Sequence, residues 1–220
     1  MAKLTWDDTG KRFYETGDKK GVLYPYDKKT GKYGTGVAWN GLTAVTESPS
    51  GAEETALYAD DIKYLSLRSA EEFGFTIEAY TYPDEWAACD GSVQVAAGVT
   101  VGQQGRSMFG FSYVSTVGND VDGNDYGYKL HLIYGATASP SERSYATIND
   151  SPEAITFSWE CSTVPVEVPG YKAIAEITID STKVDKAKLA ELEKKLYGDD
   201  TTATPTLPTV AEVIAMFAEG

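Results

Sequence analysis

Residues 72–83 read EFGFTIEAYTYP, a run in which apolar and polar side chains alternate. Successive side chains of an extended strand point to opposite faces, so the apolar residues from Phe73 to Ala79 would share one face. Glu72 and Glu78 would lie on the other face. We therefore predict a β-strand with its phenylalanine-bearing face in the core and its glutamate-bearing face in solvent.

The same alternation recurs along the chain, at residues 109–113, 126–134, 155–161 and 173–179. It places Lys129, His131, Glu160 and Glu176 on the solvated faces of their strands. Several such strands joined by turn-rich stretches are typical of antiparallel sheets with one wet face. The sequence thus predicts a mainly β fold, an antiparallel β-sandwich or barrel.

Two helices are expected to interrupt this pattern. The first is short and covers PDEWAAC, residues 83–89, where a proline and two acids suit a helix start. The second runs from Thr182 to Tyr197, because Thr182 and Asp185 have the spacing of an N-terminal cap and Gly198 is placed to end it. We expect this flanking α-helix to cover an end or a face of the sandwich.

Residues 199–220 are predicted to be a linker followed by an amphipathic segment. Thr209 and Glu212 have the spacing of a capping box ahead of an apolar stripe that reaches Phe217. So short a helix is marginal alone in water, so the stripe must dock on another surface. That surface is either the core of this chain or a neighbouring copy.

Residues 43–70, TAVTESPSGAEETALYADDIKYLSLRSA, differ from the predicted strands. They carry Pro49, Gly51 and an acidic cluster around apolar residues such as Leu57 and Ile62. We interpret them as a long internal loop. Its apolar residues either form a flap over the chain's own core or belong to an arm that buries them elsewhere.

Charge is distributed unevenly along the chain, which carries 33 acidic and 19 basic side chains for a formal net charge of −14. Residues 1–35 hold eight basic against five acidic side chains, whereas residues 36–170 hold five against 19. A basic N-terminal arm therefore precedes an acidic body. This arm is either a solvated terminal segment or a source of head-to-tail attraction between copies of the chain.

Composition argues against several classes of protein. A duplex-binding protein is disfavoured, because affinity for phosphate comes mainly from clustered Lys and Arg. No run approaches the roughly 18 apolar residues of a membrane span, and the polar N-terminus lacks the apolar centre of a signal peptide. We expect a soluble, non-exported chain in which Cys89 and Cys161 are reduced and buried.

No motif predicts catalysis. His131, the single histidine, has no nucleophile motif near it, and the glycines of residues 98–105 have the wrong spacing for a phosphate loop. NDVDGNDYG, residues 119–127, gathers oxygen ligands, but its glycine comes too early for a calcium loop, and we favour a hairpin turn. We expect no catalytic residue, metal site or cofactor, and not an enzyme.

One long ordered run resembles a known family. TWDDTGKRFYETG, residues 5–17, and the run from GVLYPYD to TYPDEW, residues 21–86, are similar to the major tail tube protein of long-tailed, siphovirus-like phages and prophages of Gram-positive bacteria. The likeness is strongest over residues 4–90 and continues more loosely to Tyr197. It rests on the run as a whole, because no short catalytic motif carries it.

The resemblance implies a tail tube β-sandwich domain over residues 1–198, which assembles into stacked hexameric rings. Those rings would form the tail tube, a conduit for DNA ejection into the host. In that family the long loop and the terminal arms bridge subunits. The corresponding contact candidates here are Lys11, Arg12, Lys19, Lys20, Leu57, Tyr58, Ile62, Tyr64 and, in the C-terminal segment, Phe217.

An acidic lumen would let DNA slide, because carboxylates and phosphates repel each other. The lumen-facing candidates are Glu72, Glu78, Glu160 and Glu176. The implied partners are the chain itself, the tape measure protein, the tail terminator, distal tail or initiator proteins, and passing DNA without specific binding, with no membrane. The implied location is the virion tail, after assembly in the host cytoplasm.

Two other functions stay open on the residues. Surface aromatic side chains also suit a carbohydrate-binding or adhesion β-sandwich, because aromatic rings can stack on sugars. A third reading is another virion component, such as a head decoration or a tail-end protein.

Overall fold

The computed structural model describes residues 3–148, 153–200 and 203–218. Its helices are η1, a 3-10 turn (Asp84–Trp86), α1 (Ala87–Asp90), α2 (Lys186–Tyr197) and α3 (Val210–Ala218). Its strands are β1 (Tyr14–Asp27), β2 (Lys32–Tyr33), β3 (Val37–Ala38), β4 (Leu42–Glu47), β5 (Ser50–Gly51), β6 (Glu54–Ala59), β7 (Ile62–Arg68), β8 (Glu71–Glu72), β9 (Gly74–Ala79), β10 (Val93–Ala96), β11 (Val99–Val101), β12 (Phe109–Asn119), β13 (Gly123–Ala138), β14 (Phe157–Thr163) and β15 (Glu176–Asp180).

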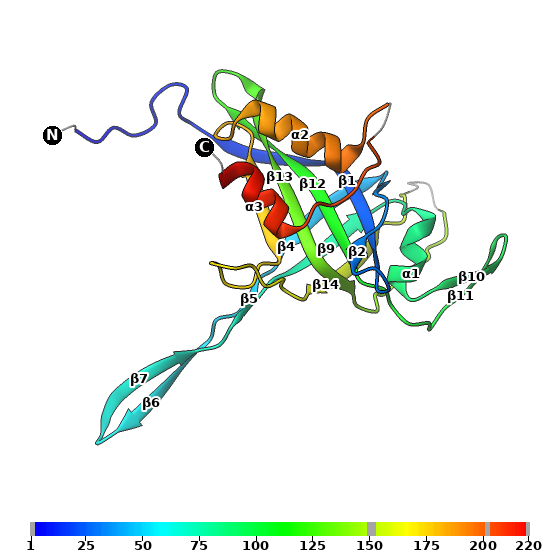
Figure 1. Cartoon of the computed structure of the whole chain (residues 1–220), viewed down its shortest axis with the longest axis horizontal. Helices are drawn as coiled ribbons and strands as arrows, with labels where there is room; N and C mark the ends of the chain where they lie inside the picture. Colours follow the sequence, from blue (N-terminus) through cyan, green and yellow to red (C-terminus); the bar gives the residue numbers. More distant parts are fainter. Residues whose placement is uncertain (1–2, 149–152, 201–202, 219–220) are drawn as a thin grey trace.

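The main sheet has the order β2-β1-β12-β13-β14-β9-β4, with β3 paired to β1 and β15 paired to β13. Its strand pairs are antiparallel, and the long hairpin of β12 and β13 crosses its middle (Figure 1). The sheet curls so that β4 returns beside β1: a Cβ on Gly21 would lie 3.0 Å from Cδ2 of Leu42. The prediction of a mainly antiparallel β fold is confirmed.

One face of the sheet packs into a core rich in aromatic rings, which we call the inner core. The strand predicted from residues 72–83 exists as β9, and its Phe75, Ile77 and Ala79 are fully buried there. The predicted short helix is also present, and it places Trp86 in van der Waals range of Phe109, with ring centroids 4.9 Å apart. The buried members are Leu23, Trp39, Phe75, Ile77, Ala79, Trp86, Cys89, Phe109, Phe111, Tyr113, Ile133, Ala136, Ala138, Trp159 and Cys161.

The opposite face of β1, β12 and β13 packs under α2 and α3 (Figure 1). We call this cluster the helix-covered core. The apolar stripe that α2 contributes to this core is the one predicted from the sequence. The hydroxyl of Tyr24 in β1 donates a hydrogen bond to the carbonyl of Leu196 at 2.9 Å and so links the sheet to this helix. The buried members are Val22, Tyr24, Val114, Leu130, Leu132, Tyr134, Val168, Ile179, Leu189, Leu192, Leu196, Leu207, Val210 and Val213.

The expectation of one wet face per strand is wrong for β12 and for the middle of β13. Ser112 is fully buried and His131 is only 8% exposed, since the helices cover one side of these strands and the curled sheet encloses the other. Gly110 makes part of this covering possible. A Cβ there would lie 2.3 Å from Cδ2 of Leu207, in the segment before α3.

The start of α2 also differs from the prediction. The helix begins at Lys186 rather than at Thr182, and Asp185 is its cap, accepting hydrogen bonds from the amides of Ala187 and Lys188 at 2.9 and 3.0 Å. Thr182 instead bonds to the carboxylate of Asp180 and stabilises the turn after β15. The predicted stop at Gly198 is confirmed, with φ of +79° at that residue.

The C-terminal helix contains the predicted capping box. The Thr209 amide donates to Glu212 at 2.8 Å, and the Glu212 amide donates to the Thr209 hydroxyl at 3.3 Å. Its apolar stripe docks on this chain, because Val210 and Val213 are each 1% exposed. Phe217 packs, half-buried, against the same core, and its contact with another subunit stays a prediction.

Two local predictions are confirmed. The predicted hairpin turn lies within residues 119–127: residues 120–122 connect β12 to β13, and the side-chain oxygen of Asn119 accepts hydrogen bonds from the amides of Val121 and Asp122. Cys89 and Cys161 are free and buried. Burial raises the pKa of Cys89 to about 12, which makes this thiol a poor nucleophile.

Candidate assembly surface and carboxylate–histidine cluster

Residues 43–70, interpreted from the sequence as a long internal loop, consist largely of paired strands, and they project as an arm rather than forming a flap over the core. β4 is a strand of the main sheet, and β5 to β8 form a long ladder that projects far from the body (Figure 1). We call residues 50–72 the projecting hairpin. It is paired at its base by β5 and β8 and at its outer end by β6 and β7.

The tip of the projecting hairpin is a tight two-residue turn. Ala59 pairs with Ile62, and the two residues between them, Asp60 and Asp61, have φ of 48° and 63°. Positive φ at both positions matches the right-handed twist of the flanking strands. Tyr64 has no partner in the register, because Leu57 pairs with Leu65 and the next pair is formed by Tyr58 and Lys63.

One face of the projecting hairpin is apolar and open to solvent. The register puts Leu57 opposite Leu65 and Ala59 opposite Ile62, so these side chains share a face with Leu67. The exposed fractions are 41% for Leu57, 66% for Ile62 and 54% for Leu67. In the part of the chain that the structure describes, neither core includes a residue between Val45 and Phe73.

The other face of the projecting hairpin carries charged side chains that form ion pairs between its two strands. Glu54 lies 2.5 Å from Nζ of Lys63 and 3.5 Å from the guanidinium of Arg68, and the hydroxyl of Ser66 donates to it at 2.5 Å. The hydrogen bond from Lys63 lowers the pKa of Glu54. The hairpin is therefore amphipathic, with the polar face tying its two strands together.

Apart from Phe217 in α3, the predicted contact residues fall into two groups. Leu57, Tyr58, Ile62 and Tyr64 all lie on the projecting hairpin and are exposed, Tyr58 by 72% and Tyr64 by 70%. Leu57 and Ile62 lie on the apolar face together with Leu65 and Leu67, which sequence analysis did not select, whereas Tyr58 pairs with Lys63 on the charged face.

The basic candidates lie around the start of β1, and three of them have partners in their own chain. Lys11 pairs with Asp8 at 3.0 Å, and Arg12 lies 3.9 Å from Asp120. Lys20 lies over the ring of Tyr197, and Lys19 is exposed in β1. The predicted basic arm of residues 1–35 is therefore not one free segment, because β1 and β2 take residues 14–27 and 32–33 of it into the sheet.

The four predicted lumen residues do not share one surface. Glu78 and Glu160 lie on the same outer face of β9 and β14, because Glu78 pairs with Ser158 and Glu160 with Thr76. Glu72 lies in β8, at the base of the projecting hairpin. Glu176 lies elsewhere, beside His131.

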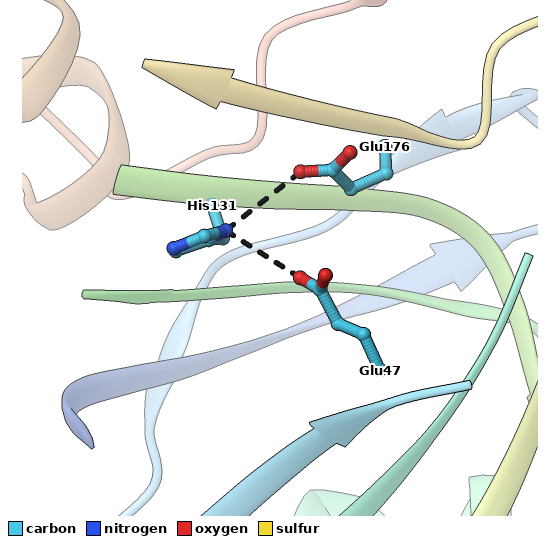
Figure 2. A group of neighbouring side chains, drawn as sticks. All are labelled: Glu47, His131 and Glu176. Atoms are coloured by element: carbon cyan, nitrogen blue, oxygen red, sulfur yellow. Dashed lines mark ion pairs between the residues drawn. The ribbon is translucent and has the colours of Figure 1, made fainter. Parts of the chain in front are cut away.

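Glu47, His131 and Glu176 converge from the end of β4, the middle of β13 and the start of β15 (Figure 2). Nδ1 of His131 lies 3.5 Å from Oε1 of Glu47 and 3.7 Å from Oε1 of Glu176, as the dashed lines in Figure 2 mark. The glutamate side chains are 37% and 25% exposed, whereas that of His131 is 11% exposed. We call these three residues the carboxylate–histidine cluster.

Each member of the cluster contacts a hydroxyl group. Tyr113 donates to Oε1 of Glu47 at 2.5 Å and stacks on the imidazole, with ring centroids 4.4 Å apart and planes at 3°. Ser115 lies 3.0 Å from Nε2 of His131. Thr178 donates to Oε1 of Glu176. Three hydroxyls therefore orient the three side chains of the cluster.

Burial and hydrogen bonding shift the pKa values here in opposite directions. Burial by itself would raise the pKa of Glu176, but the hydrogen bonds from His131 and Thr178 outweigh it and hold that pKa below its usual value. Burial, reinforced by the bond to Glu47, raises the pKa of Tyr113 well above its usual range. Tyr113 is thus a neutral hydrogen-bond donor at physiological pH.

A third carboxylate, Asp18 of β1, lies close enough to interact electrostatically with His131. Both of its oxygens are shielded from solvent and have no partner with hydrogen-bond geometry among the described residues. The amides of Lys19 and Val45 favour its charged form, but burial dominates and raises the pKa of Asp18 to about 6. Three carboxyl groups therefore lie near one imidazole.

Sequence analysis had treated His131 and Glu176 as separate solvated residues and had not selected Glu47. The register could have joined two of them, because His131 pairs with Thr178 in β15 and Glu176 precedes it on the same face.

Within the described residues, no helix has the length and apolar content needed to cross a bilayer. No known protein family model matches this chain, and no curated protein matches it either.

Proposed function

We propose that this chain is a structural subunit of a long-tailed phage tail tube. Copies of it would associate into stacked hexameric rings around an acidic channel for DNA, with no catalytic activity. The chain would reside in the virion tail and meet the tape measure, terminator and initiator proteins there. The observation that carries the proposal is the projecting hairpin with its exposed apolar face.

On energetic grounds, the apolar face of the projecting hairpin is expected to be buried against a partner. An isolated two-stranded hairpin is marginally stable in water, and contiguous exposed apolar side chains mark interaction sites. Fully burying one leucine or isoleucine contributes roughly 1.5–3 kcal/mol. Leu57, Ile62, Leu65 and Leu67 together can therefore support a substantial interface, and a closed ring would repeat it in every subunit.

Charge favours a second copy as that partner. The tip of the projecting hairpin is acidic at Asp60 and Asp61, whereas the β1–β2 turn exposes Lys28, Lys29 and Lys32. Opposite charges on different parts of one molecule favour association in a fixed orientation. This arrangement supports contact between the hairpin tip of one copy and the basic turn of the next.

The outer face of β9 and β14 suits the channel wall best. Glu78 and Glu160 lie on it, with Glu160 exposed and Glu78 half-buried, and this face is outside both cores. Carboxylates there would repel phosphate and let DNA pass without binding. Glu176 is less suited to this role, because it is turned toward His131.

The test is electron microscopy of the purified protein under conditions in which the unaltered chain forms rings or tubes, with an initiator complex added if nucleation is needed. Leu57→Asp combined with Tyr58→Asp should abolish tubes while the circular dichroism spectrum and melting temperature of the monomer stay close to those of the unaltered chain.

Tyr171→Asp is the matched control, because it places the same acid on a similarly exposed tyrosine outside the projecting hairpin. It should leave tube assembly intact. Normal tubes from the Leu57/Tyr58 variant would contradict the proposal. Binding of glycans by a protein that never forms rings would favour the carbohydrate-binding alternative instead.

A further inference from the structure

We propose that Glu47, His131 and Glu176 form a binding site for a divalent transition-metal ion, with Nδ1 of His131 and one oxygen of each glutamate as ligands. These three atoms lie within 4.8 Å of one another. Zinc bound to nitrogen and oxygen at about 2.0–2.1 Å in a tetrahedral site separates its ligand atoms by roughly 3.4 Å. The separations of 3.5 and 3.7 Å from Nδ1 to the two carboxylates are close to that value.

The surrounding hydroxyls match what a metal site needs around its ligands. A ligating histidine normally engages its second ring nitrogen in a hydrogen bond, which fixes the tautomer, and ligating carboxylates are hydrogen-bonded as well. Here Ser115 lies at hydrogen-bond distance from Nε2 of His131, and Nδ1 faces the two glutamates, with the Thr178 hydroxyl 3.3 Å from it (Figure 2). Tyr113 and Thr178 hold the carboxylates in the same way.

Charge balance points to a cation rather than to a bare carboxylate cluster. Glu47 and Glu176 face one imidazole, and Asp18 adds a third carboxylate whose oxygens are shielded from solvent. Lys129, two residues along β13, forms its ion pair with Glu15. A divalent ion would offset this negative charge, which even a protonated imidazole balances only in part.

The mixture of ligands indicates the class of metal. One imidazole nitrogen with carboxylate oxygens suits zinc and the neighbouring first-row ions, whereas magnesium and calcium prefer oxygen ligands alone. Glu47 is 37% exposed in its side chain, so an ion can enter from solvent and keep a water ligand.

Such an ion would join three strands at the base of the projecting hairpin. Glu47 is the last residue of β4, directly before the hairpin, while His131 and Glu176 belong to the body. A bound ion would therefore fix the direction in which the hairpin leaves the sheet. This inference does not depend on what the hairpin binds.

The experiment uses full-length protein stripped with EDTA and then dialysed. Zinc binding is measured by calorimetry and by the melting temperature, and cobalt(II) serves as a spectroscopic probe through its visible d–d absorption. The unaltered chain should bind one ion at this site, melt at a higher temperature with zinc, and respond far less to magnesium.

Glu47→Gln and Glu176→Gln keep the side-chain shape and remove one ligand charge each, and each should weaken zinc binding by about tenfold or more. Ser115→Ala should weaken it by roughly 10-fold to 100-fold if it acts through His131. Glu160→Gln, on the outer face of β14, is the matched control and should bind as the unaltered chain does.

Two results would overturn the inference. One is an unaltered chain whose melting temperature and heat of titration do not respond to zinc. The other is equal zinc affinity in the Glu47→Gln, Glu176→Gln and Glu160→Gln variants, which would place the ion elsewhere on this acidic surface.

Discussion

In the body, β12 and β13 bury side chains on both faces along most of their paired length, whereas β6 and β7 leave every residue except Ala56 exposed. Both pairs are antiparallel hairpins with apolar side chains. In the body, α2 and α3 cover one face of the β12–β13 hairpin, and the curled sheet encloses the other face. The projecting hairpin has an apolar face that no other part of the described chain covers. Its stability therefore depends on the surface of another molecule that it contacts.

The largest effect on stability should come from creating a cavity in the inner core. Trp86→Ala removes a fully buried ring that contacts Trp39, Phe109 and Trp159. We expect a loss of about 3–5 kcal/mol in the free energy of unfolding. Denaturant titration checks this, and a loss below about 1 kcal/mol would mean that the short helix is not part of the cooperative body.

An intermediate effect on the free energy of unfolding, one that depends on pH, is expected from substituting Asp18. Its pKa of about 6 in the folded chain lies above the ordinary value of 3.8, so the folded state loses stability as pH rises from about 4 to about 6. Asp18→Asn removes this penalty. In buffer with EDTA the variant should be about 1–2 kcal/mol more stable than the unaltered chain at pH 7.5, with no difference near pH 4. A constant difference across this range would contradict the account.

A smaller effect is expected at the start of α2. Asp185→Ala removes the side chain that accepts two amide hydrogen bonds, which should cost about 1 kcal/mol. Thr182→Ala should cost less, because Thr182 bonds only to the turn before the helix. Thermal unfolding of the two variants side by side measures the difference, and an equal loss would restore the longer helix that the sequence suggested.

The smallest effect on the monomer should come from the projecting hairpin. Leu67→Ser lies on its exposed apolar face, so the free energy of unfolding of the monomer should change by about 0.5 kcal/mol or less. The same change should weaken assembly. A loss of 2 kcal/mol or more in the isolated monomer would show that the body already covers this face, and it would remove the contrast between the two regions.

The sequence could predict the strands that bury one face, because period two is a local signal. Phe75, Ile77 and Trp159 are buried as their alternation indicates. It could not predict that the face of β13 bearing His131 is also enclosed. That burial depends on how the sheet curls and on strands far away in the chain.

The projecting hairpin was missed as a pair of strands for two local reasons. Tyr64 is an unpaired extra residue in β7, so the apolar residues on either side of it lose the two-residue period. The turn uses Asp60 and Asp61 in place of the glycine that usually marks such a turn. The carboxylate–histidine cluster was missed because its members come from three strands whose register the sequence does not reveal.

Amide hydrogen exchange of residues 54–68, compared between monomer and assembled particles, tests most directly whether the projecting hairpin binds another copy. We predict fast exchange in the monomer and strong protection in the particles, with the core strands β12 and β13 protected in both. Assembled particles in which residues 54–68 exchange as fast as in the monomer would contradict the account.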